Sequence, residues 1–369
     1  MDGNAIVYCE GAFGTTNGKT AHGLVRRTTR YRVVAVVDSR HAGRDAGEVL
    51  DARPNALPIV GSLAEGLELA ERQGAPIDYF VVGLAPDGGR LSTADRGAVM
   101  AAIEAGLHVD CGLHDFLNDD AEIAALAAEH GVRLRDVRKP PARNELHFFS
   151  GKIEEVTSLK VALLGTDSAV GKRTTAWLLV DALAEAGFPC ELVGTGQTAW
   201  MQGARYHILL DALVSDFITG ELEHATWSAW RGAAEDAGHT PPAAIVIEGQ
   251  GSLLNPAYPG GFEILAACRP DLVVLQHAPA RREYDGFPGY PIHPLPRQIE
   301  AIQVISDKPV VAVTVNHEHL TDAEIDAACR RIAEETGLPA LDVLRDGAEG
   351  LVEVLRPELE RRATESHGG

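Results

Sequence analysis

A glycine-rich segment at residues 165–175, GTDSAVGKRTT, carries the strongest chemical signal in the sequence. It follows an apolar run that predicts a buried strand, and it precedes a helical pattern. Consecutive backbone N–H groups in such a loop point inward, and the start of the helix adds about half a positive charge. Lys172 adds a full positive charge. The segment therefore predicts a site that anchors the phosphates of a nucleotide-type ligand.

The spacing of this loop differs from the standard P-loop pattern GxxxxGK[ST] in two ways. Gly165 and Gly171 are one residue further apart, and this longer form resembles the loop of dethiobiotin synthetase. Arg173 replaces the hydroxyl residue that binds Mg²⁺ in P-loop enzymes, and a guanidinium suits direct clamping of phosphate. Thr174 could still reach a metal ion if the helix starts late. The residues predicted to bind the cofactor are Gly165, Thr166, Asp167, Ser168, Ala169, Val170, Gly171, Lys172, Arg173, Thr174 and Thr175.

Polar segments also follow other predicted strands, namely VGTGQTAWMQGARY, EGQGSLLNP, QHAPARREYDGFP and NHEHL. Ligands of open α/β sheets bind beyond the carboxyl ends of the strands, so these segments are site candidates. Glu248 ends an apolar strand, where a carboxylate is costly unless a metal, proton, or substrate amine meets it, although it could also cap the next turn. His277 ends another strand and is either functional or bonded to a loop. Arg281 and Arg282 are candidate ligands of substrate carboxylates or else surface charges.

A second glycine-rich loop, EGAFGTTNGKTAHG, follows the first predicted strand. Gly11, Gly14, Gly18 and Lys19 lie in it, and Asp38 ends the next strand. This is the outline of a dinucleotide-binding fingerprint, but neither GxGxxG nor GxxxxGK[ST] is present in proper spacing. A Rossmann-like domain with a changed loop and a second nucleotide site are equally compatible with the pattern.

The elements that position these loops alternate between strand and helix. Strands are predicted at residues 5–10, 32–38, 79–83, 108–110 and 132–134, with helices at 93–105 and 120–130. After a proline-rich stretch, strands follow at 159–164, 190–193, 244–248, 272–276 and 310–315, with a helix at 171–186. Such alternation predicts α/β domains with mostly parallel sheets. We expect a Rossmann-like domain at residues 1–137, a linker at 138–150 whose Phe148 and Phe149 dock on the second domain, and a P-loop NTPase-like domain at 151–360.

Length and composition agree with two domains, because 369 residues are too many for one ordinary core. The net charge of −20 argues against nucleic-acid and anionic-membrane partners, and no apolar stretch has the length of a membrane helix. The five cysteines lie far apart without a CxxC pair, which favours reduced thiols in the cytoplasm over disulfides or a zinc site. We expect a small-molecule substrate, and the oligomeric state stays open, a homo-oligomer included.

The motifs GTDSAVGKRTTA, TGQTAW, LDALVSDFITGELE, EGQGSLLNPAY, LQHAPARR and VTVNHE together resemble one bacterial and archaeal family. That family was long classed as a domain of unknown function, with a Rossmann-like N-terminal half and a P-loop C-terminal half. Its characterised members are D-glutamate N-acetyltransferases that use acetyl-CoA. The resemblance implies acetyl transfer from acetyl-CoA to the amine of an acidic D-amino acid, with D-glutamate the first candidate.

Coenzyme A carries a diphosphate and a 3′-phosphate, so a P-loop can hold it without phosphoryl chemistry, and no metal is expected. Acyl transfer needs a base near the substrate amine, and Glu248 and His277 are the candidates. Backbone N–H groups of Gly249, Gly251 or the TGQT turn could stabilise the oxyanion of the tetrahedral intermediate. The candidates for binding the amino-acid substrate are Gln197, Arg205, Arg281 and Arg282.

A different class of function remains compatible with the motifs. A Mg-ATP-dependent ligase or kinase of the dethiobiotin-synthetase type would use Glu248 as a Mg²⁺ ligand. Arg173 argues against it, since an ATP enzyme is expected to keep the metal-binding hydroxyl after the lysine. Nucleotide sensing without catalysis is less favoured, because many polar loops converge at one sheet edge.

Overall fold

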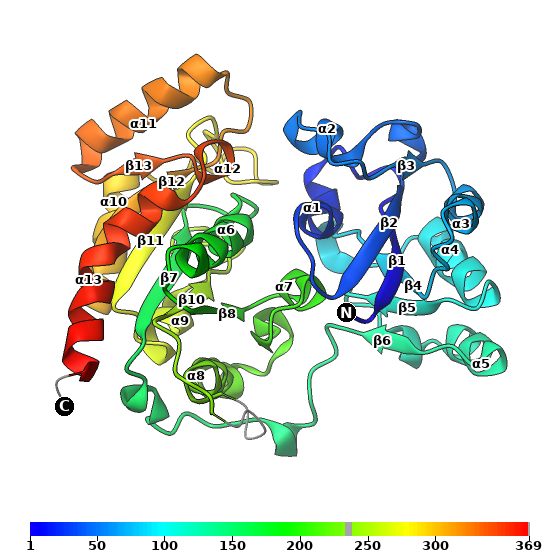
Figure 1. Ribbon diagram of the computed structural model, residues 1–369, viewed down its shortest axis with the longest axis horizontal. Coiled ribbons are helices and arrows are strands. Elements are labelled where there is room, and N and C mark those ends of the chain that lie inside the picture. The colour runs from blue at the N-terminus through cyan, green and yellow to red at the C-terminus, as the bar shows by residue number, and fades with distance from the viewer. Residues whose placement is uncertain (233–237, 368–369) are drawn as a thin grey trace. The chain divides into compact units, whose positions relative to one another are not determined.

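The structure is a computed structural model that describes residues 1–232 and 238–367 (Figure 1). The chain forms two compact units. Unit 1 comprises Met1–Pro140 together with Gln197–Gly203, and unit 2 comprises Pro141–Gly196 and the chain from Ala204 onward. Both units are α/β, as the alternation of strands and helices predicts.

Unit 1 contains a six-stranded parallel sheet in the order β3-β2-β1-β4-β5-β6. This is the Rossmann order, which reverses direction beside β1. The five predicted strands are present, with β1 two residues earlier and β6 two residues later than expected, and the two-residue β3 was not anticipated. The strands are β1 (Gly3–Tyr8), β2 (Tyr31–Val37), β3 (Ile59–Val60), β4 (Tyr79–Val82), β5 (His108–Cys111) and β6 (Leu134–Asp136). The helices are α1 (Lys19–Arg26), α2 (Ala46–Asp51), α3 (Leu63–Arg72), α4 (Thr93–Glu104) and α5 (Ala121–His130).

A short helix from the middle of the chain, α7 (Gln197–Gln202), completes unit 1. Its last residue, Gln202, donates through Nε2 to the carbonyl oxygens of Gly23 and Arg27 at 2.8 and 3.0 Å. Arg30 stacks its guanidinium 3.8 Å from the Trp200 ring centroid and donates to the Trp200 carbonyl at 2.8 Å. These contacts fix α7 to the segment around α1, so seven residues that follow β8 in sequence belong to the Rossmann-like unit.

Unit 2 contains a seven-stranded parallel sheet in the order β13-β12-β11-β7-β10-β8-β9. The strands are β7 (Leu159–Gly165), β8 (Cys190–Gly194), β9 (Tyr206–His207), β10 (Ala244–Glu248), β11 (Leu272–His277), β12 (Val310–Val315) and β13 (Ala340–Leu341). The helices are α6 (Lys172–Glu185), α8 (Ser215–Arg231), α9 (Phe262–Ala267), α10 (Leu295–Ser306), α11 (Asp322–Thr336), α12 (Val343–Asp346) and α13 (Glu349–His367). Every residue of β7 and β10 is buried, as parallel strands covered on both faces require.

Helices cover both faces of this sheet (Figure 1). One face carries alternate residues such as Leu164, Ile247 and Leu275, which belong to one core cluster with apolar residues of α8, α9, α10 and α11. Helix α6 contacts both α12 and α13, and α6 and α13 also contact β7. This arrangement leaves the carboxyl ends of β7, β10, β11 and β12 at one edge, where the polar segments follow.

The predicted linker contacts unit 2 without burying its two phenylalanine side chains. Phe148 contacts the Phe217 ring of α8 edge to face at 6.2 Å, but Phe148 and Phe149 both stay exposed, so neither is buried by docking. Among the residues that the structure describes, no helix combines the length and the apolar character needed to cross a membrane.

Candidate functional site: the phosphate loop of unit 2

The glycine loop connects β7 to α6 as the sequence predicts. Gly171 immediately precedes α6 with φ of 100°, a left-handed conformation that favours glycine, and Ala169 also has a positive φ of 51°. A Cβ atom on Gly165 would lie 2.8 Å from Cδ of Lys172, so glycine is needed for the lysine to fold back over the strand end. The local sequence therefore fixes a tight turn with the lysine lying across it.

Lys172 is held inside this loop by two carbonyl groups. Its Nζ donates to the Asp167 carbonyl at 2.7 Å and to the Gly251 carbonyl at 2.9 Å, and the residue is only 7% exposed. The ammonium group is thus fixed between the phosphate loop and the loop that follows β10. A preorganised cation at the start of a helix is suited to binding an anionic phosphate.

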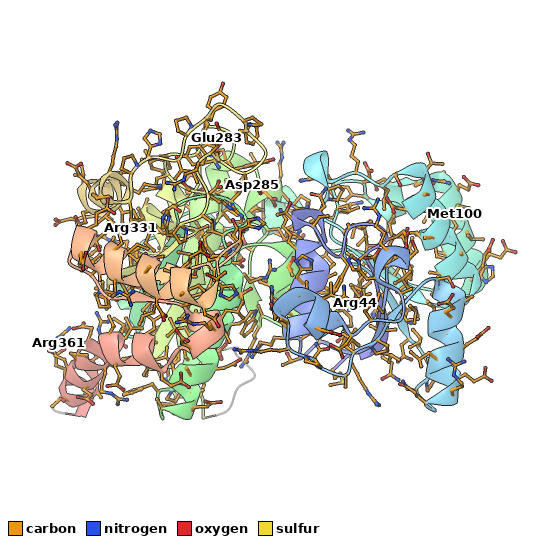
Figure 2. All side chains as sticks on the ribbon, turned by 90° about the horizontal axis from the view of Figure 1, so that it is seen from above. Arg44, Met100, Glu283, Asp285, Arg331 and Arg361 are labelled. Carbon is orange, nitrogen blue, oxygen red and sulfur yellow. The ribbon has the colours of Figure 1, made fainter. Side chains whose placement is uncertain are left out.

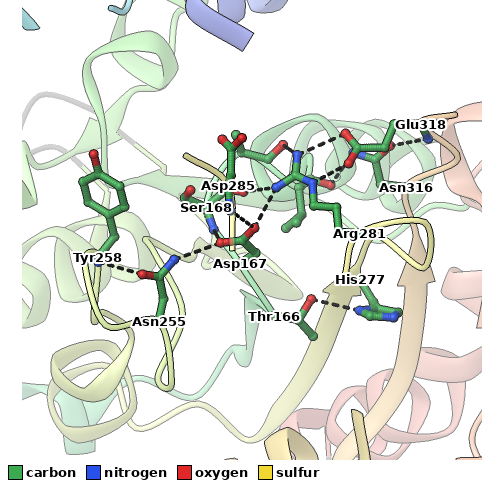
Figure 3. A network of polar contacts seen from close by, with 12 residues as sticks. Thr166, Asp167, Ser168, Asn255, Tyr258, His277, Arg281, Asp285, Asn316 and Glu318 are labelled. Carbon is green, nitrogen blue, oxygen red and sulfur yellow. Dashed lines mark hydrogen bonds and ion pairs between the residues drawn. The ribbon is translucent and has the colours of Figure 1, made fainter. Parts of the chain in front are cut away.

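Asp167 connects the phosphate loop to two other loops (Figure 3). Its buried carboxylate accepts from Ser168 N at 2.7 Å and from Asn255 Nδ2 at 2.8 Å through Oδ1. Through Oδ2 it accepts from Arg281 Nη1 and from Asp285 N, both at 2.9 Å. The loops that follow β10 and β11 are therefore both bonded to one carboxylate of the phosphate loop, and Figure 2 shows Asp285 in the second of them.

Arg281 supports the same loop with its whole guanidinium group. It donates to Asp167, to the carbonyls of Ser168 and Ala169 at 2.7 and 3.2 Å, and twice to the Glu318 carboxylate. A guanidinium has five N–H donors, so these five bonds use them all. Burial opposes its charge, but the Glu318 and Asp167 carboxylates raise the pKa of Arg281. These contacts assign Arg281 to positioning the loop, and its expected contact with a substrate carboxylate stays a prediction.

The other candidate substrate ligands lie in different surroundings. Arg282 is exposed, and Arg205 is exposed with its guanidinium 5.4 Å from the Tyr206 ring centroid. Gln197 is buried at the start of α7 and belongs to unit 1, whereas the phosphate loop belongs to unit 2. Substrate binding by these three residues remains a prediction.

Glu248 ends β10, which is hydrogen-bonded to β7, and it is 5% exposed. Its Oε2 accepts from Thr195 N at 3.0 Å, and its own carbonyl accepts from Thr195 Oγ1 at 3.0 Å. Burial raises the pKa of the carboxyl group, while the charges of Arg173 and Lys172 and the Thr195 amide oppose this rise. The carboxyl group is therefore a proton acceptor with increased basicity within the field of the phosphate loop.

His277 ends β11 and shares a hydrogen bond of 2.9 Å between its Nδ1 and Thr166 Oγ1 (Figure 3). Burial, together with the charges of Arg331 and Arg281, lowers the pKa of His277 to about 4. The imidazole is consequently neutral near pH 7 but weakly basic. Of the two candidate bases, Glu248 is better matched to removing a proton from an ammonium group.

The hydroxyl groups after Lys172 bear on metal binding. Thr175 donates through Oγ1 to Gln276 Oε1 at 2.6 Å, and Thr314 donates to the same oxygen at 2.6 Å. Thr175 is thus committed to the sheet, which leaves Thr174 as the hydroxyl nearest to the position of the usual Mg²⁺ ligand. Within residues 1–232 and 238–367, no group of three or more His, Cys, Asp and Glu side chains is arranged to hold a metal ion.

The sequence did not identify several residues of this network individually. Asn316 donates to the Val170 carbonyl at 2.9 Å, which fixes the phosphate loop from the end of β12. The next residue, His317, lies 2.5 Å through Nδ1 from the buried carboxylate of Asp342. Both follow β12 in the segment NHEHL, which was marked by its position after a strand and by the motif VTVNHE.

In unit 1, the glycine-rich loop after β1 is hydrogen-bonded to Asp38, the acidic residue at the end of β2. Asp38 is fully buried at the end of β2 and accepts from Gly11 N at 2.9 Å and from His41 Nδ1 at 2.6 Å. Phe13 is also fully buried, with its ring against those of His22 and His41. The carboxylate that would bind a ribose in a dinucleotide fold is therefore bonded to the loop itself.

A Rossmann-like unit joined to a unit with a P-loop defines the class of this protein. The chain belongs to the DUF1611 family: the model for its P-loop domain of unknown function matches residues 147–352. The model for the Rossmann-like domain of the same family matches residues 39–140. Both halves of the family architecture expected from the motifs are confirmed.

Relatives with names are also similar to this chain. A D-glutamate N-acetyltransferase of Tritonibacter scottomollicae is 31% identical over 296 residues, which cover 78% of this chain and 84% of the relative. A D-glutamate N-acetyltransferase of a Pseudoalteromonas species is 30% identical over 280 residues, which cover 74% and 80%. The crystal structure of a DUF1611 family protein from Anabaena variabilis matches with a TM-score of 0.85 and 29% identity, covering 96% of this chain and 99% of that one.

Proposed function

We propose that the protein is an N-acetyltransferase that moves the acetyl group of acetyl-CoA to the amine of an acidic D-amino acid, D-glutamate first. The names of the two relatives support the acetyltransferase class. The observation that carries the proposal is the pairing of a preorganised phosphate loop with Glu248, a buried carboxyl group of raised pKa at the adjacent strand end. Cofactor anchoring and proton removal are the two functions that acyl transfer to an amine requires.

In the proposed reaction, Glu248 accepts a proton from the substrate ammonium group. The free amine then attacks the thioester carbonyl, forming a C–N bond and a tetrahedral oxyanion. The bound nitrogen loses its second proton as collapse of this intermediate breaks the C–S bond, so that the amide forms. The sulfur leaves as the thiolate of CoA, which takes up that second proton. Backbone N–H groups of the loops after β8 and β10 are the proposed oxyanion donors.

In this proposal the phosphate loop binds and does not react. Lys172 and the N-terminus of α6 provide positive charge for a phosphate group of CoA, and Arg173 adds a guanidinium at the next position. CoA phosphates are held and never transferred, so the loop needs no divalent ion. The commitment of Thr175 to Gln276 agrees with this, because one of the two hydroxyls near the metal position is already bonded within the sheet.

The experiment mixes purified protein with acetyl-CoA and a panel of D- and L-amino acids and measures released thiol. A parallel reaction contains Mg-ATP with the same panel and is assayed for phosphate. We expect thiol release with acidic D-amino acids and no phosphate release. Phosphate release without thiol release would replace the proposal by ATP-dependent chemistry, and thiol release only with neutral or L-amino acids would correct the substrate.

A further inference from the structure

Two aromatic side chains contact each other in the loops that Asp167 holds. Tyr258 follows β10 and Phe287 follows β11, and their rings meet edge to face with centroids 5.9 Å apart. Tyr258 is 48% exposed, although it stands in a loop fixed by hydrogen bonds. Single exposed aromatic residues are common on protein surfaces. A pair from two loops beside a phosphate-binding loop is a different feature, because its position relative to that loop is fixed.

Hydrogen bonds define the position of Tyr258. Asn255, which donates to Asp167, accepts through Oδ1 from the backbone N–H of Tyr258 at 2.9 Å. The Tyr258 carbonyl accepts from Ser252 N at 3.1 Å, and Ser252 follows Gly251, whose carbonyl accepts from Lys172. Tyr258 is therefore connected to the phosphate loop along two independent routes.

Phe287 is fixed from the opposite loop. Asp285 donates its backbone N–H to Asp167 at 2.9 Å, and Phe287 follows two residues later. The Phe287 N–H donates to the Tyr284 carbonyl at 3.0 Å, which closes a turn around Asp285. Since an extended residue spans about 3.5 Å, the backbones at Phe287 and Tyr258 lie within about 10 Å of groups bonded to Asp167. Figure 3 shows Asp285 beside Asp167, with Asn255 between Asp167 and Tyr258.

We propose that Tyr258 and Phe287 form the binding subsite for the adenine ring of acetyl-CoA. This inference rests on the proposed function. In CoA only the ribose separates adenine from either phosphate group, so a loop that binds phosphate places the base close by. Aromatic rings bind nucleobases by stacking on their faces, and the half-exposed ring of Tyr258 is the proposed stacking surface, with Phe287 in contact with it. Asp167 acts as a positioning residue that holds the phosphate loop and both aromatic loops together.

The direct test measures binding of adenosine 3′,5′-bisphosphate, which carries the adenine, the ribose, the 3′-phosphate and the first 5′-phosphate of CoA but no pantetheine arm. Calorimetry compares the wild type with Tyr258→Ala, Tyr258→Phe and Phe148→Ala. Loss of one stacking partner is expected to weaken binding by roughly tenfold in Tyr258→Ala. Tyr258→Phe keeps the ring and should bind like the wild type. Phe148→Ala removes another exposed ring of unit 2 and is the matched control.

A kinetic test separates this inference from the proposed function. Tyr258→Ala should raise KM for acetyl-CoA about tenfold with little change in kcat, and it should leave the kinetics with S-acetylpantetheine, which lacks adenosine, unchanged. If the wild type transfers acetyl groups but Tyr258→Ala keeps its KM, or if both donors are affected equally, the adenine subsite is wrong while the function stands. If the wild type transfers no acetyl group, the proposed function itself fails.

Discussion

The cationic side chains of unit 2 illustrate how residue type and residue role differ. Lys172 and Arg281 both lie against the phosphate loop, and both were candidates for ligand binding. Arg281 uses its five donors on protein acceptors and is a positioning residue. Lys172 donates to two carbonyl groups, which orient its ammonium group. The two cations thus differ in their contacts, since Arg281 is bonded to the carboxylates of Asp167 and Glu318.

Replacing Lys172 by alanine should weaken acetyl-CoA binding by about tenfold or more, since it removes the fixed charge of the loop. Calorimetry measures this change directly. Lys19→Ala, a lysine in the glycine-rich loop of unit 1, is the matched control and should bind normally. Unchanged affinity in Lys172→Ala would show that the phosphates bind elsewhere.

Replacing Glu248 by glutamine should lower turnover by roughly 10²-fold or more and leave acetyl-CoA affinity within about threefold, as expected for a general base. The raised pKa of Glu248 also predicts that turnover of the wild type falls on acidification through that pKa, where the carboxyl group becomes protonated and cannot accept. Steady-state rates from pH 5 to 9 measure both effects. Near-normal turnover in the glutamine variant would transfer the role of base to His277.

At the scale of elements, long strands were predictable and short ones were not. Predicted strands at 244–248 and 310–315 have the bounds of β10 and β12, because continuous apolar runs mark strands buried on both faces. The two-residue strands β3, β9 and β13 carry no such pattern. Asp167 was predicted to bind ligand, but its partners Asn255, Arg281 and Asp285 stand 88 to 118 positions away, so its connecting role needed the fold.

The buried end of β11 should make unit 2 sensitive to acid. The pKa of His277 is about 4 in the folded chain, compared with the ordinary value of 6.5 that we expect in the unfolded chain. Between pH 4 and pH 6.5 the unfolded chain therefore binds more protons than the folded chain. The stability that depends on a neutral His277 is fully present above pH 6.5 and is lost as the pH falls toward 4. At pH 5 the loss is about 2 kcal/mol of unfolding free energy.

His277→Gln should therefore reduce the loss of stability between pH 7 and pH 5 by about 2 kcal/mol. Urea unfolding followed by tryptophan fluorescence measures it, and Trp177, Trp227 and Trp230 place most of the signal in unit 2. His319→Asn, an exposed histidine with a positive φ that asparagine tolerates, is the control. The same pH dependence in both variants would mean that His277 titrates normally.

For the whole molecule, the two-unit α/β architecture could be predicted from the chain length, the alternation of strands and helices, and the family motifs. The assignment of every segment to its unit could not. The chain passes between units three times, because Gln197–Gly203 belongs to unit 1. A helix of six residues has too few turns to show which surface it will bury, and the contacts of Gln202 and Trp200 are with residues some 170 positions earlier. The sequence placed the TGQT turn after β8 but not the unit that receives it.

The class of reaction catalysed by the whole protein can be tested through its dependence on metal. An ATP-dependent ligase or kinase transfers a phosphoryl group and needs Mg²⁺ to neutralise the developing charge. An acetyl-CoA-dependent transferase only holds its phosphates, and Arg173 stands where the metal-binding hydroxyl is usual. We therefore expect acetyl transfer to persist in excess EDTA, with Mg-ATP competing weakly or not at all. Thiol release measured with and without EDTA gives the result.

Arg173→Thr makes this test specific to the loop, because it restores the usual P-loop residue type. Loss of the guanidinium should weaken acetyl-CoA binding by about 1–3 kcal/mol, the contribution of a charge-assisted hydrogen bond to phosphate. Arg282→Thr, at an exposed arginine after β11, is the control and should keep normal affinity if Arg282 binds the amino acid or solvent alone. Acetyl transfer that stops in EDTA and returns with Mg²⁺ would overturn metal independence. Unchanged acetyl-CoA affinity in Arg173→Thr would instead leave Lys172 and the helix N-terminus as the groups that bind the phosphates, since both remain in that variant.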